Sequence, residues 1–307
     1  MQRHLKAAVA CFATILLHSF AAPAADIAPM PVKAIPAPAP YDPWRVDITP
    51  YGWLPSLNGS STIKGQTFDI DASFFGDIIH RKIPKELFGL MTAFEARNDR
   101  FAVLADFVYL KLGASKGAAR AISPGPISTL SVSASLDAKV EMIITELAGA
   151  YEIARWGAPA ATMTSIDIYG GGRLWWQQAE ADLNVTAALA LQLPKHAYVI
   201  SGGKAVAKSG DEAWVDPMVG MRLRHQFTPG HEVTVSGDVG GFGAGSEFSW
   251  QAVGLYRFEV HRTATAIWSG LVGYRALYVD YSKGAGTTLY AFDMLQHGPV
   301  FGLSLRF

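Results

Sequence analysis

The last residues of the chain constrain its fold more than any other stretch. From 301 to 307, apolar residues alternate without error with small or polar ones. The apolar positions are Phe301, Leu303, Leu305 and Phe307, and the positions between them are Gly302, Ser304 and Arg306. Alternation with period two indicates a β-strand whose two faces meet different surroundings. A soluble sandwich and a membrane barrel both contain such strands, so the rest of the chain has to decide between them.

The composition fits a large sheet better than a bundle of membrane helices. Half of the 307 residues are hydrophobic and 17% are charged, which is apolar for a soluble protein but too polar for helices in lipid. The 30 glycines, 8 tryptophans and 11 tyrosines suit a sheet with aromatic girdles at two interfaces. The net charge of zero gives no reason to expect a nucleic acid as partner.

The first 24 residues read as a signal peptide for export. Arg3 and Lys6 precede an apolar run over 7–20, and Ala22-Pro23-Ala24 fits an A-x-A cleavage site. The single cysteine, Cys11, lies inside this segment, so the mature chain is expected to have no disulfide and no thiol chemistry. A lipoprotein box ending at Cys11 is a weaker alternative, because little apolar sequence precedes it.

Residues 25–43 form an Ala/Pro-rich periplasmic linker, and residues 44–307 form the folded domain. No stretch after the signal reaches the roughly 18 apolar residues that a membrane-spanning helix needs. Alternating segments separated by Gly and Pro turns indicate strands instead. The expected strands are 44–54, 60–70, 88–97, 101–109, 130–153, 162–178, 183–193, 214–227, 232–242, 247–259, 265–281 and 287–307.

Twelve strands place both chain ends on one side of the sheet, as bacterial barrels require. Residues 113–128 and 195–210 are expected to be long loops, and the non-alternating residues 71–82 a short helix or a loop. One feature fits poorly: the loop at 113–128 then falls on the side of the chain ends, where barrel turns are usually short.

The charged residues separate a barrel from a sandwich. The polar face of a soluble sandwich lies in bulk water, whereas here that face is biased towards Arg and Asp of mixed sign, which suits a narrow lumen of guanidinium–carboxylate pairs. The expected lumen charges are Glu95, Arg97, Asp106, Glu146, Asp167, Arg173, Asp216, Arg222, Arg224, Asp238, Arg257 and Arg275. The opposite face carries aromatic residues suited to the lipid headgroup levels, namely Trp250, Tyr256, Phe258, Trp268, Tyr274 and Tyr278. The sequence therefore predicts an all-β fold, a single antiparallel transmembrane β-barrel of about 12 strands.

Several motifs resemble a family of uncharacterised outer-membrane β-barrel proteins of Gram-negative bacteria. They are Pro50-Tyr51-Gly52-Trp53-Leu54-Pro55, Glu95-Ala96-Arg97, Asp106-Phe107-Val108-Tyr109, Trp214-Val215-Asp216-Pro217 with Gly220 and Arg222, the run from Gly237-Asp238 to Gly245-Ser246, Trp250-Gln251, Gly273-Tyr274-Arg275, Asp280-Tyr281 and Gly298-Pro299. The resemblance implies the barrel fold and the outer membrane, and no established activity. The carboxy-terminal Phe307 also resembles the end of a closing strand that the bacterial barrel-assembly machinery reads.

No motif nominates a catalytic, cofactor-binding or metal-binding residue. Asp238 and Asp216 are interpreted as partners of lumen arginines, and Gly170-Gly171-Gly172 lies within a strand, so it is no phosphate loop. The histidines after the signal are His80, His196, His225, His231, His261 and His297. A Ser or Asp within hydrogen-bond reach of His225, His231 or His261 would favour a hydrolase.

These observations predict an outer-membrane barrel that acts as a narrow pore or a structural surface protein. Its expected partners are outer-membrane lipid, lipopolysaccharide and the assembly machinery, and no cofactor is expected. Two alternatives stay open: a membrane-embedded barrel hydrolase acting on lipid or peptide, and an adhesion or receptor barrel.

Overall fold

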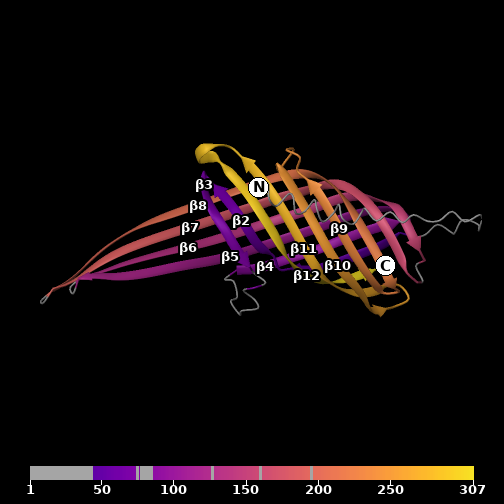
Figure 1. The fold of residues 1–307 in the computed structure, drawn as a ribbon, viewed down its shortest axis with the longest axis horizontal. Helices are drawn as coiled ribbons and strands as arrows, with labels where there is room; N and C mark the ends of the chain where they lie inside the picture. The colour runs from indigo at the N-terminus through magenta and orange to yellow at the C-terminus, as the bar shows by residue number, and fades with distance from the viewer. Residues whose placement is uncertain (1–43, 74–75, 77–85, 126–127, 159–160, 194–195) are drawn as a thin grey trace, which may run out of the picture. The chain divides into compact units, whose positions relative to one another are not determined.

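The computed structural model describes residues 44–73, 76, 86–125, 128–158, 161–193 and 196–307 (Figure 1). The predicted signal peptide and linker, and all but a few residues of the segment 71–82, lie outside these residues. Within the described residues, no helix has the length and apolar character needed to cross a membrane.

Twelve strands and one short 3-10 helix make up the described chain. They are β1 (Arg45–Trp53), β2 (Ser56–Ile63), β3 (Gln66–Ser73), β4 (Glu86–Asn98), β5 (Phe101–Gly125), β6 (Ser128–Gly157), β7 (Met163–Leu193), β8 (His196–Thr228), β9 (His231–Gly240), β10 (Phe248–Arg262), β11 (Ile267–Lys283), η1 (Gly286–Thr288) and β12 (Tyr290–Arg306).

The sheet closes on itself through its first and last strands. From β4 to β12 each strand pairs with the next along the chain, and β1 pairs antiparallel with both β4 and β12. In the closing ladder Asp47 lies opposite Arg306 and Trp53 lies opposite Val300. The prediction of an all-β antiparallel barrel is therefore confirmed, and the strand ending at Phe307 closes onto the first one.

The ring contains ten strands, β1 and β4 to β12, rather than the twelve expected. The hairpin β2–β3 is not part of the ring. Instead, β2 pairs with the first half of β12, where Ser56 lies opposite His297. Residues 183–193 are not a separate strand, because β7 continues through them to Leu193.

The two long loops expected at 113–128 and 195–210 are also wrong for the described residues. β5 runs on to Gly125, and β8 already begins at His196. Both segments pair antiparallel with their neighbours, with one register shift between Ile122 and Gly125, and this pairing satisfies their backbone groups without a strong hydrophobic pattern. In a ring of ten strands, these two segments lie at the end opposite the start of β1 and the end of β12, which we call the chain ends. This placement removes the misfit in the twelve-strand count.

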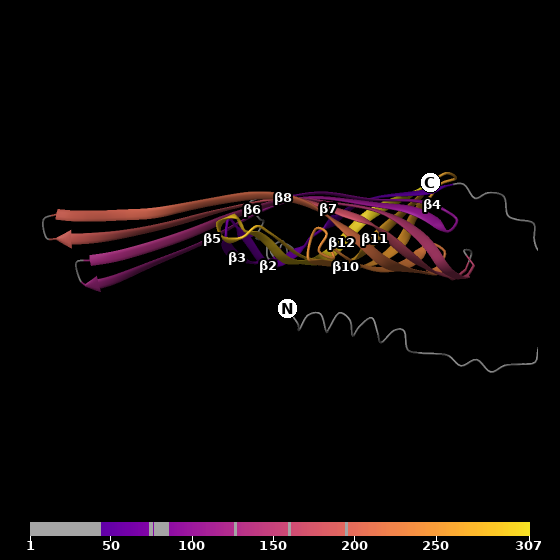
Figure 2. The ribbon, with the colours of Figure 1, turned by 90° about the horizontal axis from the view of Figure 1, so that it is seen from above.

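The extended parts of β5 to β8 form a four-stranded sheet that projects beyond the ring (Figure 2). We call it the blade and define it as residues 113–125, 128–139, 179–193 and 196–210. One ladder runs across it, from Ser115 to Asp137, Asp182 and Ala207. The turns at the other end are short, as at Asn98–Phe101 and Thr228–His231, where the opposed pairs close each hairpin.

The outer face of the ring is apolar. On β12, Phe301 and Leu303 keep 49% and 54% of their surface exposed, and Phe307, directly after the strand, keeps 56%, whereas Ser304 is buried on the inner face. The same holds on other strands for exposed Leu147, Leu174, Val215, Val219, Val235 and Val272. A closed barrel with this surface has the architecture of transmembrane β-barrels.

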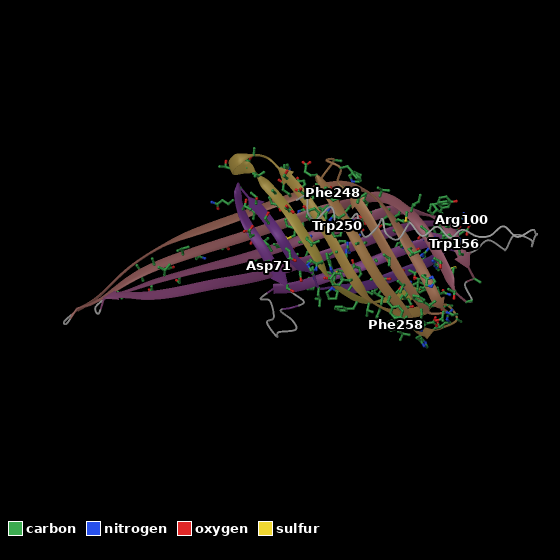
Figure 3. The ribbon with its side chains drawn as sticks, in the orientation of Figure 1. Asp71, Arg100, Trp156, Phe248, Trp250 and Phe258 are labelled. Atoms are coloured by element: carbon green, nitrogen blue, oxygen red, sulfur yellow. The ribbon has the colours of Figure 1, made fainter. Side chains whose placement is uncertain are left out.

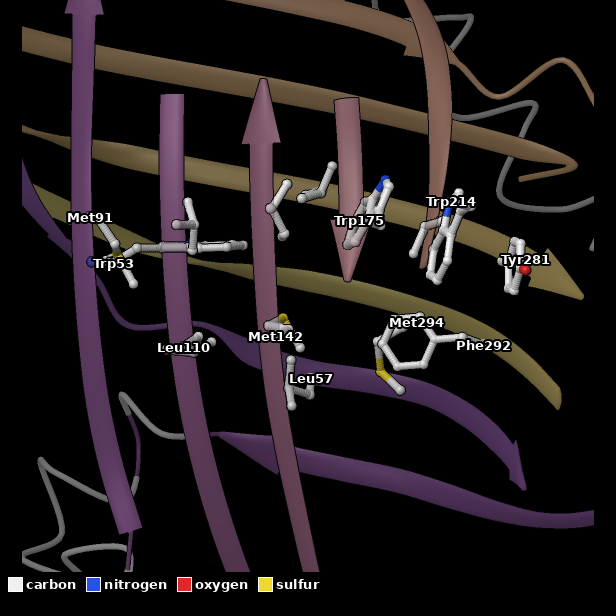
Figure 4. Packing of buried hydrophobic residues seen from close by; sticks show 14 of the residues in the cluster. Trp53, Leu57, Met91, Leu110, Met142, Trp175, Trp214, Tyr281, Phe292 and Met294 are labelled. Atoms are coloured by element: carbon white, nitrogen blue, oxygen red, sulfur yellow. Dashed lines mark hydrogen bonds between the residues drawn. The ribbon is translucent and has the colours of Figure 1, made fainter. Parts of the chain in front are cut away.

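The inner face carries a hydrophobic core at the blade end of the ring (Figure 4). We call this core the aromatic layer; its large members are Trp53, Trp175, Trp214, Tyr281, Tyr290 and Phe292, packed with Met91, Met142 and Met294. The hairpin β2–β3 contributes Leu57 and Ile63 to the layer. Its β2 reaches across to β8, since a Cβ added at Gly210 would lie 3.3 Å from Ile63.

Candidate functional site

The lumen between the aromatic layer and the chain ends holds two networks of ion pairs. The first, the Asp167 network, joins β4, β7 and β8. Asp167, which is fully buried, accepts hydrogen bonds of 2.8 Å from both Arg97 and Arg222. Glu95 pairs with the same two arginines and with Arg224 at 2.9, 2.9 and 3.4 Å respectively.

The second, the Glu146 network, joins β5, β6, β7, β9 and β11. Arg173 donates to Glu146 at 2.8 Å and to Asp238 at 2.7 Å, and no part of its side chain is exposed. Arg275 donates to Asp106 at 2.7 Å and to Glu146 at 3.1 Å. Charge-assisted bonds of this length are strong when both partners are out of water, so the two arginines tie five strands together.

Neutral side chains complete the Glu146 network, which has three carboxylates for two guanidinium groups. The Tyr51 hydroxyl donates to Asp106 at 2.7 Å, and the Tyr169 hydroxyl donates to Asp238 at 3.1 Å. Gln251 donates to Asp238 at 3.2 Å. These donors supply the additional hydrogen bonds that buried carboxylates require when three of them share two guanidinium groups.

A smaller group lies nearest the chain ends. Asp47 pairs with Arg306 at 2.8 Å, with Arg257 at 3.1 Å and with Arg45 at 3.6 Å. Arg257 and Arg306 remain about a quarter exposed, at 24% and 26%. This group therefore lines the open end of the lumen.

Asp216 forms no ion pair among the described residues, contrary to its interpretation as an arginine partner. It accepts hydrogen bonds from the Trp175 indole at 3.1 Å and from the backbone and hydroxyl of Ser246 at 2.7 and 2.8 Å. Asp216 is fully buried, so it anchors the β9–β10 loop to the wall of the barrel next to the aromatic layer. The alternation placed Asp216 on the inner face, but the loop residue that it binds gave no signal.

The structure places all twelve of the expected lumen residues on the inner face. All except Asp216 take part in the ion pairs just described, and Asp238 bonds Arg173 rather than Arg222, Arg224 or Arg275. The interacting residues outside the expected set are Arg45, Asp47, Tyr51, Glu152, Tyr169, Gln251 and Arg306. Glu152 is 2% exposed and has the parity of Glu146 on the same strand, so the alternation already contained the signal for it.

The aromatic layer closes the lumen on the blade side of the Glu146 network. The Trp175 and Trp214 rings stack with centroids 5.6 Å apart, and the Trp214 and Tyr281 rings with centroids 3.8 Å apart. The three side chains are 0%, 6% and 5% exposed, so almost none of their surface is in contact with water. Between the layer and the chain ends lies a cavity of about 210 Å³, lined by residues of both networks and by Arg306.

The histidines do not assemble a hydrolase site within the described chain. His225 lies 2.8 Å from the Thr164 hydroxyl, and His231 lies 2.7 Å from the Tyr256 hydroxyl. No Ser or Asp forms a hydrogen bond with His225, His231 or His261 in the part of the chain that the structure describes. The geometry that would favour a hydrolase is therefore not found there.

No family model and no curated protein matches the chain. Among solved structures, a FadL homologue of Pseudomonas aeruginosa aligns with a TM-score of 0.27 and 7% identity over 86% of this chain and 89% of its own. Neisserial surface protein A aligns with a TM-score of 0.26 and 10% identity over 86% and 95%. The outer membrane protein opdK of P. aeruginosa aligns with a TM-score of 0.22 and 8% identity over 86% and 98%. Because these scores are low, the class of this protein rests on its own features: a closed antiparallel barrel, apolar outside and ion-paired inside.

Proposed function

We propose that the chain is an outer-membrane β-barrel with a closed lumen that presents the blade at the cell surface. The observation that carries this proposal is the aromatic layer, whose inward side chains leave almost no surface open to water. The apolar outer face supports a lipid environment, because a soluble barrel would expose it to water.

The orientation follows from the lengths of the connections. In bacterial barrels the short turns face the periplasm and the long connections face outwards. The chain ends and the turns at Asn98–Phe101 and Thr228–His231 would then be periplasmic, and the blade extracellular. Outer-membrane lipid and lipopolysaccharide would surround the ring, and Phe307 would be read by the barrel-assembly machinery.

Single-channel recording in a planar bilayer tests the closed lumen. The refolded protein, with its fold verified by heat-modifiable gel mobility, is expected to give no conductance. Replacing Trp175, Trp214 and Tyr281 together with Ala removes the stacked rings and is expected to produce openings. Trp268→Ala is the control, because this tryptophan lies on the outer face and is 42% exposed.

Steady conductance through the unmodified protein would contradict the closed lumen and favour the narrow pore. The cavity of about 210 Å³ between the aromatic layer and the chain ends is the feature on which such a pore would rest. A mature chain that stays in solution without detergent would contradict the membrane barrel itself.

A further inference from the structure

A groove of about 530 Å³ runs along the outer face of the ring over β5 to β8. Its floor is formed by Gly149 and Gly170, which lie opposite each other on β6 and β7. Phe101, Tyr151 and Ile168 form walls, and their exposed fractions of 65%, 38% and 44% show that they face outwards. The groove lies on the half of the ring near the chain ends, since Phe101 follows directly on the β4–β5 turn.

Backbone geometry and packing do not require the two floor glycines. Neither has a positive φ, a Cβ added at Gly149 would meet no atom within 4 Å, and one added at Gly170 would meet only the Met218 carbonyl, at 3.5 Å. The neighbouring Gly171 differs, because a Cβ there would lie 2.0 Å from the Leu147 carbonyl oxygen. What Gly149 and Gly170 achieve is the depth of the groove.

The end of the groove next to the chain ends has aromatic and basic side chains. Trp44, which is 52% exposed, lines the groove. Arg100, which is exposed, directly precedes the wall residue Phe101, and Figure 3 labels Arg100 and Trp156 at the same end of the ring. Aromatic rings and arginines at one level of a membrane barrel are typical of the lipid headgroup region. If the acyl chain of a lipid lies in the groove, the anionic headgroup of that lipid is thus within reach of Arg100.

We propose that this groove binds one acyl chain of a phospholipid from the membrane leaflet nearest the chain ends, with its phosphate at Arg100. The inference rests on the proposed membrane barrel. An acyl chain fits the groove because the lining is apolar and hollow, and burial of each CH₂ group contributes to binding. A second copy of the chain fits less well, since two hollow surfaces with arginines at the same end do not complement each other.

Native mass spectrometry of detergent-solubilised barrel after incubation with phosphatidylglycerol vesicles tests the groove. The unmodified protein is expected to retain one phospholipid, and Gly149→Leu to retain about tenfold less, since the new side chain displaces about two CH₂ groups. Gly254→Leu is the matched control, because Gly254 is a strand glycine on β10 with nothing within 4 Å of an added Cβ. Arg100→Ala is expected to weaken retention of phosphatidylglycerol but not of uncharged diacylglycerol.

Equal retention by Gly149→Leu and Gly254→Leu would overturn the inference. So would a dimer of the unmodified protein that Gly149→Leu converts into a monomer, because that result identifies the occupant as a second copy. Heat-modifiable mobility and insertion into vesicles are recorded for every variant. Failure of the unmodified protein to insert would refute the proposed function, whereas normal insertion without retained lipid refutes only the groove.

Discussion

Arg173 has no exposed surface and bonds two carboxylates, Glu146 and Asp238, on two other strands. Its replacement by Ala leaves both carboxylates buried without their main partner, which typically costs about 3–5 kcal/mol. We therefore expect Arg173→Ala to lower the free energy of unfolding strongly, measured by urea titration in lipid vesicles. Arg262→Ala is the control: its ion pair with Glu259 is at the surface, so stability should not change measurably.

Alternation along the strands predicted which charged side chains enter the lumen but not how they pair. Asp238 illustrates the limit: three arginines were candidates, and its partner is Arg173, which comes 65 residues earlier in the chain. Pairing depends on the stagger between strands around the whole ring, and a single strand carries no record of that stagger. The same reasoning applies to Asp216, whose partner Ser246 lies in a loop with no periodicity.

The blade is an element that adds length without adding to the core of the barrel. Both ion-pair networks and the aromatic layer use residues outside the blade as defined above. Replacing residues 114–138 and 180–209 by short turns is therefore expected to leave a folded barrel with heat-modifiable mobility and an unchanged urea midpoint. A shortened chain that no longer folds would show that the blade takes part in assembly of the ring.

The blade segment 113–125 was hard to predict as a strand because its composition is weak for both strand and loop. Residues 113–125 are mostly Ala, Gly, Ser and Lys, so apart from Ile122 they lack the β-branched and aromatic residues that mark strands elsewhere in the chain. Their conformation comes from pairing with β6, for example Ala118 opposite Ala134. That long-range ladder is not visible in a local pattern, and without it the Pro124-Gly125 pair indicates a loop.

For the molecule as a whole, the sequence contained the fold class, the closing strand and a strand count close to that of the structure. The error was to place all twelve strands in the ring, which holds ten. Local alternation could not show that two predicted strands are one long strand, as with β7. Nor could it show that the single predicted strand 60–70 is the hairpin β2–β3, which lies outside the ring. The error had a visible symptom, a long loop on the side of the short turns. A predicted number of barrel strands can therefore be tested against the lengths of the predicted connections, because the long connections should all lie on the side opposite the chain ends.

The orientation of the whole molecule gives the last prediction. The mature chain is expected to lack cysteine, since Cys11 falls in the predicted signal peptide, so single cysteines can be introduced without background. Ser133→Cys lies exposed in the blade, and Pro229→Cys lies exposed in the turn between β8 and β9. In intact cells a membrane-impermeant maleimide is expected to label Ser133→Cys and to spare Pro229→Cys, while lysed cells show both labelled. The reverse pattern in intact cells would place the blade in the periplasm. The lipid groove would then lie in the outer leaflet, and the phosphate near Arg100 would have to come from lipopolysaccharide.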